Sequence, residues 1–165
     1  MKLLLNERGE VHWIIIFFGS ILIGFSIMFI VIDNWYISQI DRKTTRIVNE
    51  LNLDIYTLLD VEYTAYETGF NIKNDSEALD KFVKGLQPRF RLNESLQPLP
   101  DSPFEGAVNI ELFKVVHENE VPYSDGYGRT MEFPGIIAVL NVPLKTPLLG
   151  ITGTHKVLIT TEVYR

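Results

Sequence analysis

The chain has no cysteine among its 165 residues. This absence excludes both a disulfide framework and a thiolate-bound metal centre. The three histidines are His12, His117 and His155, and none has a partner three or four residues further on that would complete a metal-binding pair. We therefore expect neither a metal ion nor another cofactor.

A cluster of basic residues is also lacking. Lys and Arg together number 15 against 21 for Asp and Glu, which gives a formal net charge of −6 at pH 7. Proteins that bind nucleic acid carry a basic surface that neutralises phosphate groups. Nucleic acid is therefore not an expected partner.

Recognisable catalytic motifs are missing as well. The sequence has no phosphate-binding glycine loop and no Gly-x-Ser-x-Gly motif. The segment Asp125-Gly-Tyr-Gly shares part of the pattern of a calcium loop, but the alternating acidic ligands and the distal glutamate are absent. We interpret this segment as a turn, and we expect a protein that is not an enzyme.

What the chain does have is a long uncharged run. No Asp, Glu, Lys or Arg occurs in residues 11–32. As an α-helix this run would be about 33 Å long, enough to cross a hydrocarbon core of about 30 Å. Trp13 lies at one end, and Trp35 and Tyr36 lie at the other, where amphipathic aromatic side chains fit the two headgroup regions. The sequence predicts a transmembrane helix over residues 11–32, after a short polar tail at residues 1–10.

A buried core helix or a removable secretory signal would also contain an apolar run. A domain of this size has little room to surround so long an apolar helix. A secretory signal has an apolar region of about 7 to 15 residues, followed by small residues at the cleavage site. This run is longer, and it ends in Val31, Ile32, Asp33, Asn34 and Trp35. We therefore expect the segment to remain attached as an anchor.

An apolar stripe with helical spacing continues beyond the run. It consists of Ile37, Ile40, Thr44, Ile47, Leu51, Ile55 and Leu58. No proline occurs before Pro88, so we predict that the helix continues through residues 33–68 and stops at Gly69. We expect the stripe to pack on a small sheet. If the chain assembles as a subunit, the upper part of the stripe would pack on the protein's own sheet, and Ile40 and Ile47 would pack on neighbouring subunits. A coiled-coil seam is the alternative.

The remainder, residues 69–165, is predicted to form an α+β domain. Asn74 and the two residues after it are good N-cap residues. Apolar residues at helical spacing follow, so we expect a short helix that ends at Gly85 and Pro88. Residues 93–106 contain three prolines, two serines, Asn93 and Gly106 and are predicted to be a loop.

Three stretches of the last third have the apolar pattern of strands. They are residues 107–117, 136–142 and 155–164, separated by a glycine-rich turn at 122–130 and by Pro143, Pro147 and Gly150. In the first stretch, Val108, Ile110 and Leu112 would share one face of the sheet. The expected fold class is α+β: a long N-terminal helix, transmembrane and then amphipathic, followed by a short helix and a small antiparallel β-sheet.

This layout resembles that of pilin-like proteins, and most closely that of the TadE-like pseudopilins of Flp/Tad pilus systems. Arg8-Gly9 precedes the apolar helix, as an Arg-Gly pair often does in that family, and residues 138–165 run strand, proline-containing turn, strand. The resemblance implies a membrane-anchored structural subunit of a bacterial pilus, secretion or DNA-uptake machine. Its partners would be the lipid bilayer and other membrane subunits, in a homo- or hetero-oligomer formed through the N-terminal helix.

The resemblance also implies a processing site. Prepilin peptidases typically cut after the glycine, which here would be the bond between Gly9 and Glu10. The mature chains of the family usually carry glutamate at the fifth position, where this sequence has Ile14. The carboxylate that would pair with a neighbour's new amino group is therefore missing, and with it one polar interaction that helps to place subunits in a membrane.

The charges that flank the run do not decide its orientation. Lys2 and Arg8 precede it, and Arg42, Lys43 and Arg46 follow it, which is close to a tie under the positive-inside rule. We expect the N-terminus inside the cell and the long acidic remainder outside, partly because the resemblance implies an extracytoplasmic domain. The alternative function is a single-pass, membrane-anchored binding or sensor module, which should have a ligand cavity.

Overall fold

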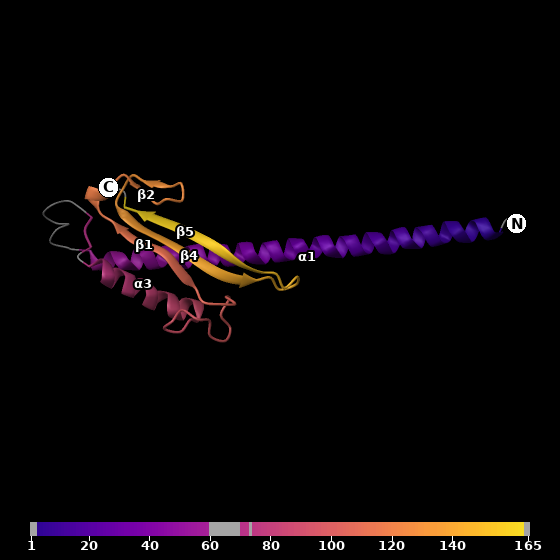
Figure 1. Ribbon diagram of the computed structural model, residues 1–165, viewed down its shortest axis with the longest axis horizontal. Coiled ribbons are helices and arrows are strands. Elements are labelled where there is room, and N and C mark those ends of the chain that lie inside the picture. The colour runs from indigo at the N-terminus through magenta and orange to yellow at the C-terminus, as the bar shows by residue number, and fades with distance from the viewer. Residues whose placement is uncertain (1–2, 60–69, 73, 164–165) are drawn as a thin grey trace.

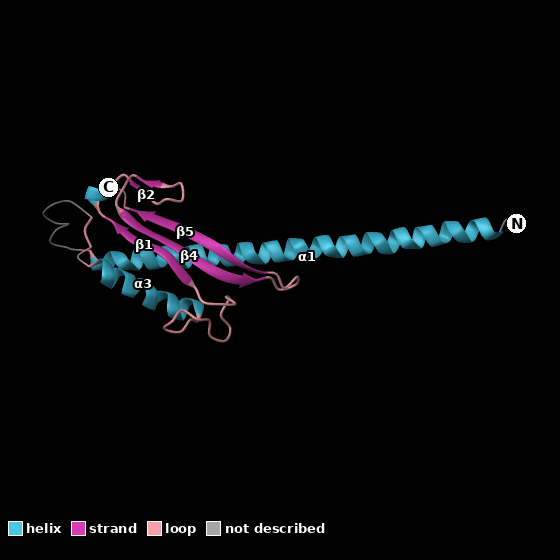
Figure 2. Ribbon diagram, in the orientation of Figure 1, coloured by secondary structure: helices cyan, strands magenta, loops and turns pink. Residues whose placement is uncertain are grey.

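The computed structural model describes residues 3–59, 70–72 and 74–163, with side chains from residue 12 onward. Its elements are α1 (Leu3–Ile55), the 3-10 helix η1 (Tyr56–Leu58), α3 (Asp75–Phe90), β1 (Asn109–Val116), the 3-10 helix η2 (Glu118–Glu120), β2 (Tyr123–Ser124), β3 (Thr130–Met131), β4 (Gly135–Lys145) and β5 (Thr152–Glu162). The first half of α1 projects from a small domain, and α3 and the strands gather around its second half (Figure 1). The helices α1 and α3 precede the strands, which form a small antiparallel sheet and a short hairpin, and of the described helical elements only η2 lies among the strands (Figure 2). This arrangement confirms the predicted α+β class.

The helix α1 ends earlier than the sequence predicts. It is unbroken for 53 residues, from Leu3 to Ile55, and the single 3-10 turn of η1 follows. Leu59 then adopts an extended backbone with ψ 139° and pairs with Ile72 in an isolated antiparallel bridge. The predicted continuation of the helix is therefore wrong at Leu59, and the rest of the predicted segment, residues 60–68 and Gly69, lies outside the described residues. Apolar residues keep their helical spacing as far as Leu58, so periodicity gives no signal of this end.

The helix α3 begins where predicted and continues further than predicted. The side chain of Asn74 accepts hydrogen bonds from the backbone N–H groups of Ser76 and Glu77 at 3.1 and 3.3 Å, which confirms the N-cap. The prediction that the helix ends at Gly85 and Pro88 is wrong, since both lie inside it. Gly85 is needed for packing, because a Cβ atom there would overlap the side chain of Leu51 on α1.

Pro88 stands within the last turn of α3, so its missing N–H removes only one hydrogen bond near the end of the helix. The helix is closed instead by Arg91, which adopts the left-handed conformation with φ 52°.

The main sheet has three antiparallel strands in the order β1-β4-β5. The central strand β4 is buried along most of its length, as its continuous apolar run predicts. The prediction that Pro143 ends this strand is wrong, because β4 continues to Lys145. The carbonyl of Pro143 accepts a hydrogen bond from Glu105, on the side opposite β5. The missing N–H points to that same side, so pairing with β5 is undisturbed.

A β-bulge in β1 reverses its pattern of inward-facing residues. Ile110 pairs with Leu140 and Leu112 pairs with Val139, so Glu111 is an extra residue in the strand. Ile110 therefore packs on the main core, whereas Leu112 packs on the opposite face. The prediction that Leu112 shares a face with Ile110 is wrong for this reason.

Candidate membrane and assembly surface

The first half of α1 is an exposed apolar surface. Its large exposed side chains are Trp13, Ile14, Ile15, Ile16, Phe17, Phe18, Leu22, Ile23, Phe25, Ile27, Met28, Phe29, Ile30, Val31 and Ile32. An apolar patch of this extent marks a contact with a membrane or another protein. By length and composition, α1 is long and apolar enough to cross a membrane. It fits a membrane anchor, although a signal sequence near an N-terminus meets the same criterion.

The two serine hydroxyls within this surface are hydrogen-bonded to the backbone of the helix itself. The hydroxyls of Ser20 and Ser26 donate hydrogen bonds to the carbonyls of Phe17 and Leu22 at 2.8 and 2.9 Å. These bonds lie within the helix itself, so neither hydroxyl needs a water molecule or a partner chain. Gly19 and Gly24 have no atom within 4 Å of the place where a Cβ would stand, so in this single chain they form open positions on the helix.

The three predicted interface aromatics divide into two kinds. Trp13 and Trp35 are exposed, so their rings are available to an interfacial layer. Tyr36 is half-buried and packs against the core of the domain. The structure thus gives Tyr36 a role in holding α1 to its own domain, which the sequence pattern does not indicate.

The stripe on the second half of α1 lies in the core of the same chain. Ile40, Ile47, Leu51 and Ile55 are buried, and Ile37 and Leu58 are partly buried against the same cluster. The expectation that Ile40 and Ile47 pack on neighbouring subunits is therefore wrong. The β-sheet extends far enough along α1 to cover them, as the 11 residues of both β4 and β5 allow. Val48, next to Ile47, is fully buried too. The buried face of α1 is therefore wider than the predicted stripe, as in helices that pack on a broad surface.

Asp33, the first charged residue after the uncharged run, is buried and has a structural role that the sequence pattern does not indicate. Its carboxylate oxygens accept hydrogen bonds from the backbone N–H groups of Leu148 and Leu149 at 3.0 and 2.9 Å. Burial by itself raises the pKa of this carboxyl, but these two bonds and one from the Thr146 side chain lower it below its usual value. Asp33 thus joins α1 to the turn between β4 and β5. A buried carboxylate needs such donors, and only the fold supplies them, 115 residues away in the sequence.

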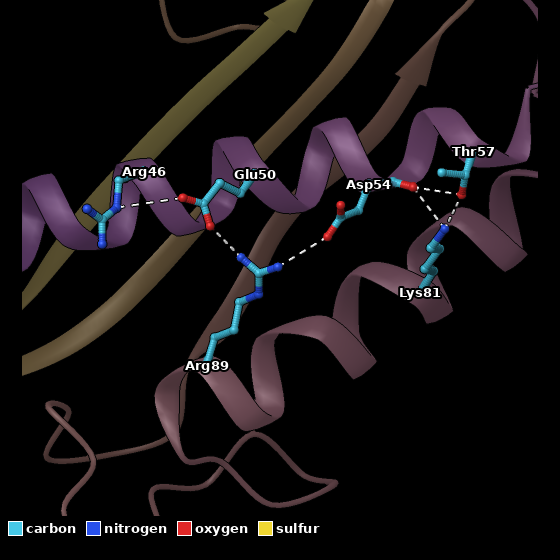
Figure 3. A network of polar contacts seen from close by, with 6 residues as sticks. All are labelled: Arg46, Glu50, Asp54, Thr57, Lys81 and Arg89. Carbon is cyan, nitrogen blue, oxygen red and sulfur yellow. Dashed lines mark hydrogen bonds and ion pairs between the residues drawn. The ribbon is translucent and has the colours of Figure 1, made fainter.

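A polar network joins the exposed sides of α1 and α3 (Figure 3). The guanidinium of Arg89 contacts Glu50 at 2.6 Å and Asp54 at 3.2 Å, and Lys81 donates to the carbonyl of Asp54 at 2.8 Å. Arg46 extends the network along α1, 3.7 Å from Glu50. These groups are largely exposed, so each pair contributes about 1 kcal/mol or less to stability. The network fixes the antiparallel register of the two helices more than it stabilises them.

A second set of polar contacts joins α1 to β5. The amide nitrogen of the buried Asn52 donates to the hydroxyl of Thr161 at 3.0 Å, and the hydroxyl of Tyr56 donates to the carbonyl of Thr161 at 2.9 Å. Burial, together with the negative charge of Glu162, raises the pKa of Tyr56 to about 12. Nearer the uncharged run, His155 on β5 lies 2.9 Å from Asp41 on α1. These contacts make α1 an integral part of the domain.

The outer face of the sheet carries a carboxylate with three partners. Glu111, the bulge residue, accepts hydrogen bonds from Lys156, Tyr127 and Asn141 at 2.7 to 2.9 Å. Lys156, then Tyr127 and Asn141, hold the pKa of Glu111 at about 2. The same tyrosine lies under the Lys156 ammonium, 4.7 Å from ring centre to nitrogen. This cluster fastens the β2–β3 hairpin over the sheet.

The segment Asp125-Gly-Tyr-Gly forms the turn of that hairpin. One carboxylate oxygen of Asp125 accepts hydrogen bonds from the backbone N–H groups of Tyr127 and Arg129 at 2.7 and 3.0 Å. Gly126 and Gly128 have positive φ values of 77° and 89°, which only glycine adopts without strain. Among the residues that the structure describes, no three His, Asp or Glu side chains are grouped to hold a metal ion.

Two open grooves border α1 just beyond its apolar surface. One is lined by α1 and β5 and includes Arg42, Arg129 and Lys156, and the other includes Tyr36, Lys43 and Pro103. Both are lined by charged and polar side chains as well as apolar ones, unlike the mostly apolar clefts that hold small ligands.

At the other end of α1, Gly9 and Glu10 lie in the helical backbone, and their side chains are outside the described part of the chain. Comparisons with protein-family models, curated proteins and solved structures found no match for this chain.

Proposed function

We propose that the protein is a non-enzymatic, membrane-anchored structural subunit of the pilin or pseudopilin kind. It assembles with other membrane subunits of a bacterial envelope machine, with its domain on the outer side of the cell membrane. The observation that carries the proposal is the division of α1 into two halves. Residues 13–32 expose their apolar side chains, and residues 40–55 of the same unbroken helix form the spine of the domain.

The join between the two halves supports a retained anchor rather than a removable leader. The apolar run ends at Ile32, and the next residue, Asp33, is already bound to the turn between β4 and β5. No flexible linker separates the two halves, because both belong to one helix. Any movement or packing of the apolar half is therefore transmitted directly to the domain. This property suits a subunit whose stem sets the position of its domain in an assembly.

The exposed half of α1 also offers a surface for helix packing. Small residues allow transmembrane helices to approach one another closely, and the open positions at Gly19 and Gly24 are available for such contacts. Since Ile40 and Ile47 lie in the chain's own core, assembly contacts of α1 are confined to its apolar half and to exposed residues beyond it. Ile14 in place of the family's usual glutamate means that apolar packing, not an ion pair, carries these contacts.

Cysteine crosslinking tests the assembly directly, because the natural chain has no cysteine. Single cysteines at each position from Phe17 to Phe29 are labelled with a benzophenone maleimide and photolysed in native membranes, with Leu79→Cys, exposed on α3, as the control. Packed helices give crosslinked products at positions three or four residues apart and weak products between them. If no position on the apolar half gives a product with another copy or another membrane protein, the assembly role is refuted. The anchored binding or sensor module is then the better account.

Two further measurements test the anchor and its orientation. Protease added to intact protoplasts digests the domain if it lies outside, and leaves it intact if the orientation is reversed. Edman sequencing of membrane-extracted protein should begin no later than Glu10, and a start at Glu10 itself shows cleavage after Gly9. A start beyond Ile32 contradicts the retained anchor.

A further inference from the structure

The turn between β4 and β5, residues 146–151, is a second apolar surface, which we call the hairpin tip. Leu148, Leu149 and Ile151 are exposed to 47%, 44% and 59%. The tip is the end of the sheet that reaches furthest along α1 toward the N-terminus (Figure 1). Three large apolar side chains on one short turn are unusual at a surface that meets only water.

The hairpin tip is fixed at the level where the apolar run of α1 ends. Asp33 follows the last residue of that run, and its carboxylate lies 3.0 and 2.9 Å from the backbone nitrogens of Leu148 and Leu149. A helix rises about 1.5 Å per residue, so the leucines stand within a helical turn of Ile32. If residues 11–32 span a bilayer, the tip is therefore at its surface.

Every backbone N–H group of the tip has an acceptor within the protein. Thr146 donates its N–H to the carbonyl of Ile151 at 3.0 Å, and Gly150 donates to the carbonyl of Thr146 at 3.2 Å. Ile151 donates to the Thr146 hydroxyl at 2.9 Å, Leu148 and Leu149 donate to Asp33, and Pro147 has no N–H. A turn in water does not need this, because water accepts such bonds. A segment that enters lipid does need it.

The charge pattern of the tip matches an interfacial layer. No charged residue occurs from Thr146 to Thr154, and Lys145 stands exposed immediately before this stretch. A lysine at that place extends its ammonium to the headgroups while apolar neighbours lie deeper. Trp35, exposed on α1 two residues beyond Asp33, is the kind of side chain found in the same layer.

We propose that the hairpin tip enters the interfacial layer of the bilayer that holds α1, with Leu148, Leu149 and Ile151 in contact with lipid and Asp33 as the clamp that fixes their depth. This inference rests on the proposed membrane anchor and adds a second point of contact. A contact beside α1, added to the membrane contact of α1 itself, restricts the tilt of the domain over the membrane, which a single helix does not. We expect lipid to cover the tip because the tip lies at the level where the exposed apolar half of α1 ends.

Depth-dependent quenching tests this proposal in the full-length protein. Three single-cysteine variants, at Leu149, Ile27 and Leu79, are labelled with the fluorophore NBD. They are reconstituted into vesicles of phosphatidylcholine and phosphatidylglycerol that contain lipid with a doxyl group near the headgroup. Leu79 is the matched control, an exposed leucine near the start of α3, and α3 begins at the end of the domain away from the tip (Figure 1). We expect doxyl lipid to quench the label at Leu149 severalfold more than the label at Leu79, and aqueous iodide to do the reverse. Adding Asp33→Ala should reduce the lipid quenching at Leu149.

The label at Ile27 separates failure of this inference from failure of the proposed function. If doxyl lipid does not quench Ile27, the anchor itself is wrong. If Ile27 is quenched while Leu149 is as accessible to iodide as Leu79, the anchor stands and the hairpin-tip proposal is overturned. Protection of Leu149 from both quenchers, with oxidation of Leu149→Cys to a crosslinked dimer, also overturns it, because a second copy then covers the tip.

Discussion

Leu51 on α1 fills the space over Gly85 on α3, so that a Cβ atom at position 85 would overlap its side chain. Leu51 is itself buried and has little room to move aside. The close approach of the two helices explains why α3 contains glycine at a position where a better helix former would otherwise be expected.

We expect Gly85→Ala to destabilise the domain despite the better helix propensity of alanine. Overpacking in a core costs about 1–3 kcal/mol, and alanine regains about 1 kcal/mol of helix propensity, so a net loss of about 1 kcal/mol in the free energy of unfolding remains. Denaturant unfolding of the full-length protein in detergent measures it. In a Leu51→Ala background, where the overlap is removed, Gly85→Ala should be neutral or stabilising. An equal loss in both backgrounds would show that the contact with Leu51 is not the cause.

Ile47→Glu should unfold the domain rather than weaken contacts between subunits. Ile47 is exposed to only 7% in the core, whereas Leu53 on the same helix is exposed to 49%. A buried, unpaired carboxylate costs several kcal/mol, a large part of the stability of a domain this size. Leu53→Glu is the matched control and should change the free energy of unfolding by about 0.5 kcal/mol or less. If Ile47→Glu leaves the melting temperature unchanged but abolishes crosslinking, Ile47 faces a neighbour after all.

The sequence predicts the elements of this fold better than their ends. The uncharged run, the stripe and the three strands are periodic patterns that depend on burial alone, and they identify α1 and the main sheet. The errors occur where one partner atom decides the outcome. Gly85 lies within α3 because its lack of a side chain makes room for Leu51, Pro143 stays in β4 because its nitrogen faces away from β5, and Glu111 is an extra residue that forms a bulge. None of these relations is visible in one segment of sequence.

The sequence likewise predicts one part of the candidate surface and not another. The apolar half of that surface is visible in the sequence as an absence of charge, but the clamp by Asp33 is not, since its partners are backbone groups of residues 148 and 149. The sequence holds a signal of the hairpin tip alone, namely the uncharged stretch at residues 146–154 between two lysines at 145 and 156.

The Glu111 cluster should make the attachment of the β2–β3 hairpin sensitive to acid. The pKa of the Glu111 carboxyl in the folded protein is about 2, below its ordinary value of 4.5. A carboxyl whose pKa is lowered on folding stabilises the folded state at every pH above its ordinary pKa. That stabilisation is lost as the pH falls through the pKa of the folded state. The melting temperature of Glu111→Gln should therefore depend less on pH between 4.5 and 2 than that of the natural protein.

The control for this experiment is Glu94→Gln, at an exposed glutamate in the loop between α3 and β1. It should keep the pH dependence of the natural protein. If Glu111→Gln and Glu94→Gln melt alike across this range, the contacts of Glu111 with Lys156, Tyr127 and Asn141 do not persist in solution.

The clamp between Asp33 and the hairpin tip should be measurable one amide at a time. Hydrogen exchange at the backbone N–H groups of Leu148 and Leu149 should be slow in the natural protein and fast in Asp33→Ala, because their acceptor is removed. Asn34→Ala, at the exposed neighbouring residue, is the control and should leave both amides slow. Since hydrogen bonds lower the pKa of Asp33 below 3.8, protection should persist above that pH and disappear only as pH falls through the lowered value. Slow exchange at both leucines in Asp33→Ala would mean that the turn holds itself in place, and the depth of the hairpin tip would then need another cause.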